Sequence, residues 1–240
     1  MRIAILADIH ANLEALDKAF EILKTKRVDQ TVCLGDVIGY GANPNECLAR
    51  VREMISHVLL GNHDQASLDL TGAESFNPYA LSSAHWTSQQ LTEDNKQYLR
   101  TLPYTMQLEN VFFVHASPFQ PEEWHYIISS ADARDNFDHF QQPVCFVGHS
   151  HVAGMFMSNH SGHIAVKRGW NIRPGEKYIV NVGSVGQPRD GDWRLSFGIF
   201  DTEKWTYEHI RSEYDVQTAS RKILQAGLPR ILGERILVGR

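Results

Sequence analysis

A short apolar stretch that runs directly into polar side chains constrains the fold of this chain most strongly. Residues 2–7 are almost entirely apolar and predict a strand covered on both faces. Asp8 and His10 follow at once, two positions apart, so both should project to one side as the chain leaves the sheet. A carboxylate and an imidazole at one strand end suit a divalent cation. Taken alone, Asp8 could equally cap a helix, with His10 as a surface histidine.

The same arrangement recurs along the chain. Further strands are predicted at 30–34, 56–60, 111–114 and 144–147, and each runs into a loop that begins with polar residues. Open α/β sheets collect their ligands at the carboxyl ends of their strands. Five such strand ends favour one shared site over five unrelated loops. The loops after the later four strands supply Asp36, Asn62, His63, Asp64, His115, His149 and His151.

Helices are predicted between these strands, and the second part of the chain is rich in strands. Asn12 can cap a helix over 13–23, Asn43-Pro44 can start another, and apolar spacing predicts helices at 79–102 and 216–226. After His151 we expect strands at 164–167, 177–182, 195–200 and 205–210. No repeat or linker is evident, so we expect a single domain over 1–240, with room for a small helical cap within 65–110 and 117–142.

Composition excludes several classes of protein. The chain has 240 residues and a net charge of −5, which argues against a protein that coats polymeric nucleic acid. No apolar run is long enough to span a bilayer, and the first residues lack a signal-type region, so we expect a cytoplasmic protein without membrane contact. Cys33, Cys47 and Cys145 share no metal-type spacing and are expected to be buried thiols.

The candidate ligands, taken as a set, point to a two-metal site. Two carboxylates, one amide oxygen and four imidazoles suit two cations that share one carboxylate. Two such ions about 3.5–4 Å apart can hold an attacking hydroxide and phosphoryl oxygens together. Each ligand alone has an ordinary alternative: Asp36 could be a turn aspartate, Asn62 a left-handed loop residue and His115 a core histidine.

In their order along the chain, these motifs resemble the calcineurin-like metallophosphoesterases. The motifs are Asp-x-His, Gly-Asp, Gly-Asn-His-Asp, His and Gly-His-x-His, from Asp8 to His151. Residues 181–190 are similar to a segment of small bacterial and archaeal phosphodiesterase-like members. The resemblance implies an α/β fold, a four-layer α/β/β/α sandwich of two mixed sheets. It also implies that Asp8, His10 and His151 bind one metal, that Asn62, His115 and His149 bind a second, and that Asp36 bridges them.

The resemblance also implies a reaction. A hydroxide that bridges two divalent metal ions would attack phosphorus in line, while His63 assists the leaving oxygen and Asp64 orients and charges His63. Manganese is the expected metal, and Fe, Zn, Ni or Co would fit the same ligands. A phosphodiester is the first expectation for the substrate, with a phosphomonoester, including a phosphoprotein, or a dinucleoside polyphosphate as alternatives. A non-catalytic metal-binding interaction module is the alternative of another class.

Candidate substrate contacts lie beside these motifs. Asn12 resembles the asparagine that often follows the first histidine of the family, although helix capping explains it equally well. Tyr40 lies close to Asp36 in the sequence, and Arg189 could grip a phosphate or simply be solvated. The expected partner is a small phosphorylated molecule such as a nucleotide, and the oligomeric state is left open. One wall of the cleft could be formed by Trp124, His125 and Tyr126.

Overall fold

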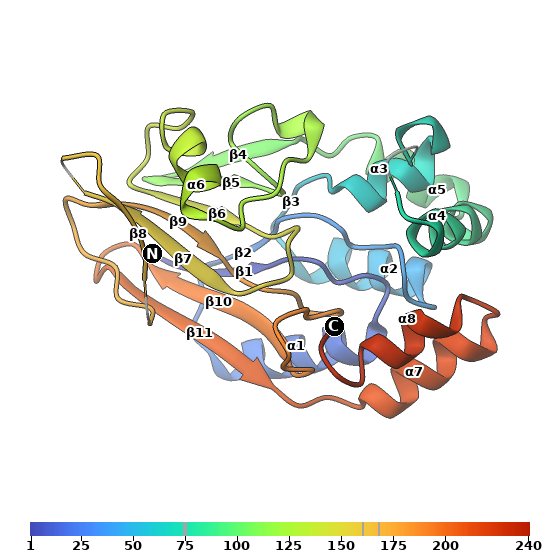
Figure 1. Cartoon of the computed structure of the whole chain (residues 1–240). Helices are drawn as coiled ribbons and strands as arrows, with labels where there is room; N and C mark the ends of the chain where they lie inside the picture. The colour runs from blue at the N-terminus through green and yellow to red at the C-terminus, as the bar shows by residue number, and fades with distance from the viewer. Residues whose placement is uncertain (74–75, 160, 168) are drawn as a thin grey trace.

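Two mixed β-sheets pack face to face and carry helices on their outer faces (Figure 1). The computed structural model describes residues 1–73, 76–159, 161–167 and 169–240. The first sheet has the order β11-β10-β1-β2-β3 and the second β4-β5-β6-β9-β7-β8. The strands of the first sheet are β1 (Arg2–Leu6), β2 (Gln30–Cys33), β3 (His57–Val58), β10 (Leu195–Asp201) and β11 (Thr206–Ser212). Those of the second are β4 (Thr105–Leu108), β5 (Val111–Val114), β6 (Val144–Val147), β7 (Gly154–Ser158), β8 (Ile164–Val166) and β9 (Lys177–Asn181).

The alternation of side chains along β1 explains how the layers are joined. Ile3 and Ile5 belong to the core between the two sheets, whereas Ala4 and Leu6 belong to the core between the first sheet and its helices. Successive residues of a strand point to opposite faces, so a continuous apolar run is what a strand buried on both faces requires. Strand β5 shows the same alternation in the second sheet. The predicted α/β/β/α sandwich is therefore confirmed.

The outer helices complete the layers. Helices α1 (Leu13–Thr25), α2 (Pro44–Met54), α7 (Val216–Gln225) and α8 (Arg230–Arg235) bury apolar residues in the core of the first sheet. Helix α6 (Ser130–Phe137) packs on the outer face of the second sheet through Ala133 and Phe137. The helix within 117–142 is therefore a layer of the sandwich rather than part of a cap.

A group of short helices lies at one end of the sandwich, beyond β3 (Figure 1). It contains α3 (Asn62–Leu68), the 3₁₀ turn η1 (Leu70–Ala73), α4 (Pro78–Gln90) and α5 (Glu93–Leu99). The single helix predicted over 79–102 was wrong, because the chain breaks at Leu91 and the Thr92 side chain caps a new helix at the Asn95 N–H, 3.3 Å away. Apolar spacing continues across this break and does not reveal it.

Three elements of the structure were not predicted, and one predicted loop is helical. Strands β4 and β7 and helix α8 were not predicted, and the loop expected at 61–64 begins helix α3. The cysteines agree with the prediction, since all three are buried and free, and burial raises the pKa of each thiol. None of the described helices is long and apolar enough to cross a membrane.

Candidate metal centre

The predicted metal ligands meet where strands of both sheets end. The ligand atoms of Asp8, His10, Asp36 and His151 all lie within 4.8 Å of one another. Those of Asp36, His115 and His149 form a second group by the same measure. Both groups are buried and share Asp36. The Asn62 Oδ1 atom lies 3.2 Å from the His115 Nε2 atom, beside the second group.

The distances place Asp36 at the centre of the two groups. Its Oδ2 atom lies 3.6 Å from His10 Nε2 and 3.4 Å from His115 Nε2. In the first group, His151 Nε2 lies 3.4 Å from Asp8 Oδ1 and 3.0 Å from His10 Nε2. Two imidazole nitrogens this close cannot both carry an outward proton, so at least one presents its lone pair.

Main-chain carbonyl groups orient three of the imidazole rings. In each ring the Nδ1 atom faces a carbonyl oxygen, which leaves Nε2 pointed into the site. Metal-binding histidines are typically held in this way, because a donating Nδ1–H fixes the tautomer and the ring direction. The pairs are His10 with Ile38 at 3.1 Å, His115 with Leu34 at 3.2 Å and His151 with Gln187 at 2.6 Å.

The loops that carry the ligands adopt an unusual backbone conformation. Of the eleven non-glycine residues with positive φ in the described chain, seven lie in these loops. A left-handed conformation costs an L-residue about 1–2 kcal/mol, and such strain persists only where surrounding structure enforces it. At the five of these positions that carry candidate ligands, glycine would relieve the strain but would remove the ligand. The seven residues are Asp8, His10, Ala11, Asp36, Tyr40, His149 and His151.

Buried polar atoms without partners show that the cluster fits divalent cations. Among the described residues, Asp36 Oδ2 and His149 Nε2 are buried and have no hydrogen-bond partner. Burial raises the pKa of Asp8 to about 8. Burial lowers the pKa of His115, but the Asp36 carboxylate outweighs this and raises it to about 9. Asp8 and His115 would have to be deprotonated to bind a metal ion, since ligands lose their protons on metal binding.

His63 lies on α3 beside the ligands. Its ring centroid is 5.1 Å from that of His10, 4.3 Å from Tyr40 and 4.6 Å from Phe76. Burial lowers the pKa of His63 to about 4, so its imidazole is neutral at pH 7 in this structure. Its Nδ1 atom is buried and has no partner in the described chain. One ring nitrogen of His63 is thus not used by the described part of the fold.

Asp64 does not take the position expected of it. Its Oδ1 atom accepts the Ile38 N–H and its Oδ2 atom accepts the Gly61 N–H, both at 3.1 Å. The expectation that it orients the His63 ring is corrected, because adjacent residues on a helix point in different directions. Asp64 instead joins the loop after Asp36 to the start of α3, and burial raises its pKa to about 7.

Asn12 is also used by the fold. Its Oδ1 atom accepts the Ala15 N–H at 3.1 Å, which caps α1. Its Nδ2 atom donates to Gly186 O at 2.8 Å and to the Tyr214 hydroxyl at 3.1 Å. These bonds use the acceptor and both donor hydrogens of the amide. The capping interpretation is therefore confirmed, and the substrate contact predicted for Asn12 is wrong.

The segment 181–190 packs against the loops that carry the ligands and hydrogen-bonds to them. Ser184 Oγ donates to Asp8 O at 2.8 Å, and Asn181 Nδ2 donates to Gly148 O at 2.5 Å. Gly186 approaches the first loop so closely that a Cβ there would lie 1.8 Å from Ile9 O. Sequence reasoning pointed to the glycines but missed Asn181 and Ser184. The signal was present, since β9 is a sixth strand that ends in polar residues.

A cleft of about 250 Å³ opens over the cluster, between aromatic side chains. Tyr40 and Phe76 line it beside His63, and Trp124 and Tyr126 also line it. The Tyr126 ring stacks on His149 at 4.1 Å. Trp124 and Tyr126 thus lie where the sequence suggested, whereas His125 stacks on Phe119 instead, at 5.7 Å.

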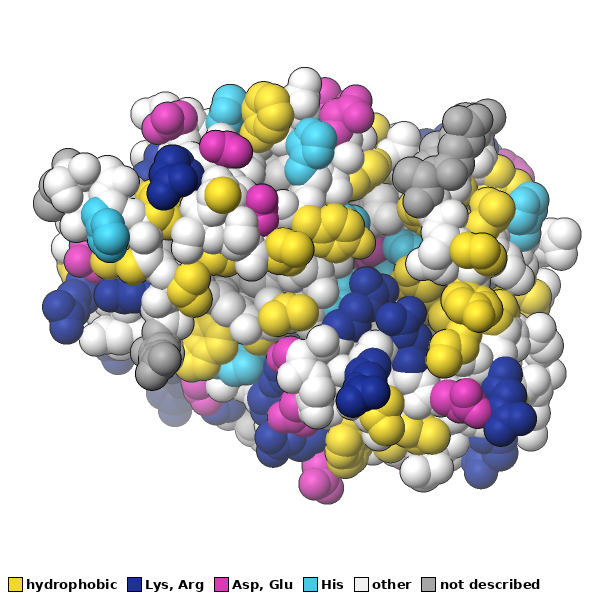
Figure 2. Space-filling model, viewed as in Figure 1, with side chains coloured by type: hydrophobic (Ala, Val, Ile, Leu, Met, Phe, Trp, Pro, Cys, Tyr) yellow, Lys and Arg dark blue, Asp and Glu magenta, His cyan; other side chains and the backbone are white. Residues whose placement is uncertain are grey.

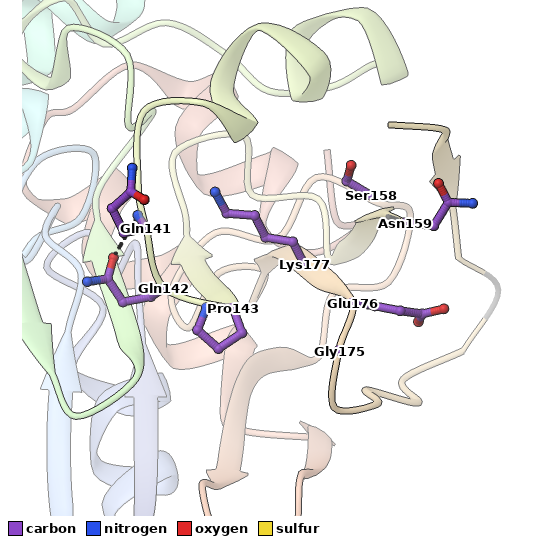
Figure 3. A pocket seen from close by; sticks show the side chains of 8 residues that line it. All are labelled: Gln141, Gln142, Pro143, Ser158, Asn159, Gly175, Glu176 and Lys177. Carbon is purple, nitrogen blue, oxygen red and sulfur yellow. Dashed lines mark hydrogen bonds between the residues drawn. The ribbon is translucent and has the colours of Figure 1, made fainter. Parts of the chain in front are cut away.

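A larger hollow, of about 330 Å³, lies away from these ligands (Figure 3). It is formed where β6 and β9 begin, at the edge opposite to the strand ends that carry the metal ligands. Its cation, Lys177, donates to Phe137 O at 2.5 Å and to Phe140 O, so the ammonium group is already satisfied by the fold. Lys177 is therefore not free to bind a ligand in this hollow.

Fold and site together define a metallophosphoesterase-type protein with a buried cluster of candidate metal ligands. The chain belongs to the calcineurin-like phosphoesterase superfamily, whose model matches residues 1–205. It is 38% identical over 244 residues to an uncharacterized protein of Methanocaldococcus jannaschii, covering 99% of this chain and 98% of that protein.

Two solved structures are similar over essentially the whole chain. A metallophosphoesterase from Sphaerobacter thermophilus has 36% identity and a TM-score of 0.88, covering 100% of this chain and 99% of that one. A hypothetical protein from Pyrococcus horikoshii has 18% identity and a TM-score of 0.82, covering 100% and 98%, which shows a shared fold. The resemblance found in the sequence is thereby confirmed at the level of family and fold.

Proposed function

We propose that this protein is a divalent-metal-dependent phosphoester hydrolase whose preferred substrates are phosphodiesters. The observation that carries the proposal is the convergence of two buried ligand groups on the shared carboxylate of Asp36. Membership of the calcineurin-like phosphoesterase superfamily supports the same reaction class. A non-catalytic module would have no use for His63, whose unpaired ring lies in the cleft beside the ligands.

The ligand groups suit two ions, with manganese as the first expectation. One would be held by Asp8, His10 and His151, the other by Asn62, His115 and His149, with Asp36 shared. The inward Nε2 atoms of three histidines and the unpartnered Asp36 Oδ2 support this division. Bound divalent cations supply Lewis acidity, which polarises phosphoryl oxygens and lowers the pKa of water.

His63 is the residue of the chain that would act on the leaving group. Its ring is fixed between Tyr40 and Phe76, and its main-chain N–H is anchored to Asp36 Oδ1 at 2.8 Å. The neutral ring can donate a hydrogen bond to a leaving oxygen. A negatively charged phosphate beside it would raise the pKa of His63 towards neutrality, where proton transfer is most effective.

The aromatic lining of the cleft supports a diester over a monoester. A diester carries two organic groups on phosphorus, and the cleft is lined by Tyr40 and Phe76 as well as by Trp124 and Tyr126. Aromatic rings of this kind stack on planar groups such as nucleobases. We therefore propose a small phosphorylated molecule, with a nucleotide portion, as the substrate. Phosphomonoesters and dinucleoside polyphosphates are the alternatives within the same chemistry.

The test is Mn²⁺-dependent hydrolysis of bis-p-nitrophenyl phosphate compared with p-nitrophenyl phosphate. We expect higher kcat/KM for the diester and loss of both activities with a chelator. Turnover of the monoester alone would replace the diester assignment with a phosphatase. No turnover of either compound by protein that holds two metal ions would contradict the proposed reaction.

A further inference from the structure

Two arginines from distant parts of the chain lie over one tyrosine at the edge of the metal centre. The guanidinium carbon of Arg189 lies 5.6 Å from the centre of the Tyr40 ring, and that of Arg235 lies 6.0 Å from it. The same ring is 4.7 Å from the ring of His10 and 4.3 Å from that of His63. The arginines are therefore separated from the candidate reaction site by a single aromatic side chain.

Neither guanidinium is paired with an Asp or Glu side chain within the described part of the chain. The acids nearest to Arg189 in the sequence are already engaged, because Asp190 pairs with Arg211 and Asp192 pairs with Arg194. Arg189 Nη2 donates to the neutral amide of Gln187 at 3.0 Å, and the side chain also hydrogen-bonds to Tyr40, which is neutral as well. Arg189 Nε is buried without a partner in the described chain.

Arg235 keeps most of its hydrogen-bonding capacity. Its Nε atom donates to the oxygen of Arg240 at 2.6 Å, and its Nη groups have no acceptor among the residues that the structure describes. The side chain is half-buried, so it still reaches solvent. Burial and the neighbouring Arg189 charge both lower the pKa of Arg235, as expected for two positive charges held close together.

This arrangement exceeds what packing requires. One guanidinium over Tyr40 would satisfy a cation–π contact, whereas two repel each other unless an anion lies between them. Positively charged side chains gather beside the histidines in a hollow of this face (Figure 2). A scissile phosphodiester carries one negative charge, which the metal centre itself would neutralise. The two arginines are left for a separate anionic group.

We infer that Arg189 and Arg235 form a second phosphate subsite next to Tyr40, so that the preferred substrate carries a phosphate in addition to the scissile one. The inference rests on the proposed function and narrows its substrate class. Planar guanidinium groups bind phosphate oxygens in pairs, so two of them at one place suit a doubly charged terminal phosphate. The second phosphate can belong to a phosphoanhydride chain or to a separate ester on the same molecule.

The test is calorimetric titration of the Mn²⁺-loaded full-length protein with three probes that differ only in phosphate. They are adenosine 5′-monophosphate, adenosine 5′-diphosphate and adenosine 3′,5′-bisphosphate, each shown to be intact after titration. We expect about tenfold tighter binding of at least one of the last two, which corresponds to about 1.4 kcal/mol. Tighter binding of the diphosphate would indicate that the second phosphate belongs to a phosphoanhydride chain. Tighter binding of the bisphosphate would indicate a separate phosphate ester on the same molecule.

The variants decide whether the arginines are responsible. Arg235→Gln should reduce the difference in binding affinity between the probes to less than about threefold, with metal content unchanged. Arg235→Lys should restore only part of this difference, because an ammonium lacks the paired donors. Arg230→Gln is the control, since Arg230 lies on the same helix but pairs with Glu234 at 2.6 Å. Equal affinity of the unmodified protein for all three probes, or an undiminished difference in affinity in Arg235→Gln, would contradict the proposed phosphate subsite. Failure of the proposed hydrolysis is read separately, from the diester assay, because this difference in affinity needs no turnover.

Discussion

Asp36 accepts the main-chain N–H of His63 through Oδ1 at 2.8 Å, while its Oδ2 atom faces the histidines of both ligand groups. One carboxylate therefore couples the position of the metal centre to that of the residue proposed to act on the leaving group. Burial alone would raise the pKa of Asp36, but the imidazoles of His115, His63 and His10 outweigh it and hold the pKa below its ordinary value. Asp36 is thus ionised and ready to bind a cation.

Asp36→Asn should weaken metal binding by at least tenfold. The amide is neutral and offers one oxygen instead of two, so it cannot serve both groups while also accepting the His63 N–H. Metal content after dialysis, measured by elemental analysis, checks this expectation. Full retention of two ions by the variant would show that Asp36 is not the shared ligand.

His63→Ala should keep the metal content of the unmodified protein and lose about 10²–10⁴-fold in kcat on bis-p-nitrophenyl phosphate. The ring contributes no atom to either ligand group, whereas the main-chain N–H that bonds to Asp36 is retained in alanine. Parallel kinetics and elemental analysis separate the two effects. If His63→Ala and Asp36→Asn lost metal equally, this division of roles would be refuted.

Asp64→Ala should reduce the free energy of unfolding by about 2–4 kcal/mol, because two buried N–H groups lose their acceptor. Asp64→Asn should lose about half as much, since its oxygen can still accept one of the two. Urea denaturation measures both variants. Asp135→Ala, which changes an exposed residue of α6, is the control and should shift stability by less than about 0.5 kcal/mol. An unchanged free energy of unfolding in Asp64→Ala would contradict the structural role of Asp64.

Gly186→Ala should destabilise the protein by about 3 kcal/mol or more, and lower Tm by about 6–12 °C for a chain of this size. A Cβ at Gly186 would lie 1.8 Å from Ile9 O, so the loop that carries Asp8 and His10 would have to move. Gly154→Ala is the matched control, because a Cβ there meets no atom within 4 Å. Thermal unfolding of both variants tests the prediction, and similar Tm values would show that the loop yields easily.

Much of the site could be predicted because its signal is local. Each ligand follows a predicted strand, and strand ends of one sheet meet at one edge, so Asp8 and Asp36 of the first sheet, like His115 and His149 of the second, could be brought together without coordinates. Residues that act across the chain could not be found in this way. Arg235 reaches Tyr40 only because α8 packs beside the first sheet. The sequence around Arg235 does not predict where this helix packs.

The roles of Asn12 and Asp64 also could not be predicted from local sequence patterns. Both residues sit within motifs of the metal centre, yet hydrogen bonds to distant partners commit their side chains to the fold, Asn12 to Gly186 and Tyr214, Asp64 to Ile38. The sequence by itself determined the buried strands and the donor set, since apolar periodicity and ligand chemistry are properties of neighbouring residues, and the expectation of a sandwich came from the resemblance of its motifs to a family. Only the tertiary structure decided which polar side chains remain free for a ligand, because hydrogen-bond partners are chosen by position in space.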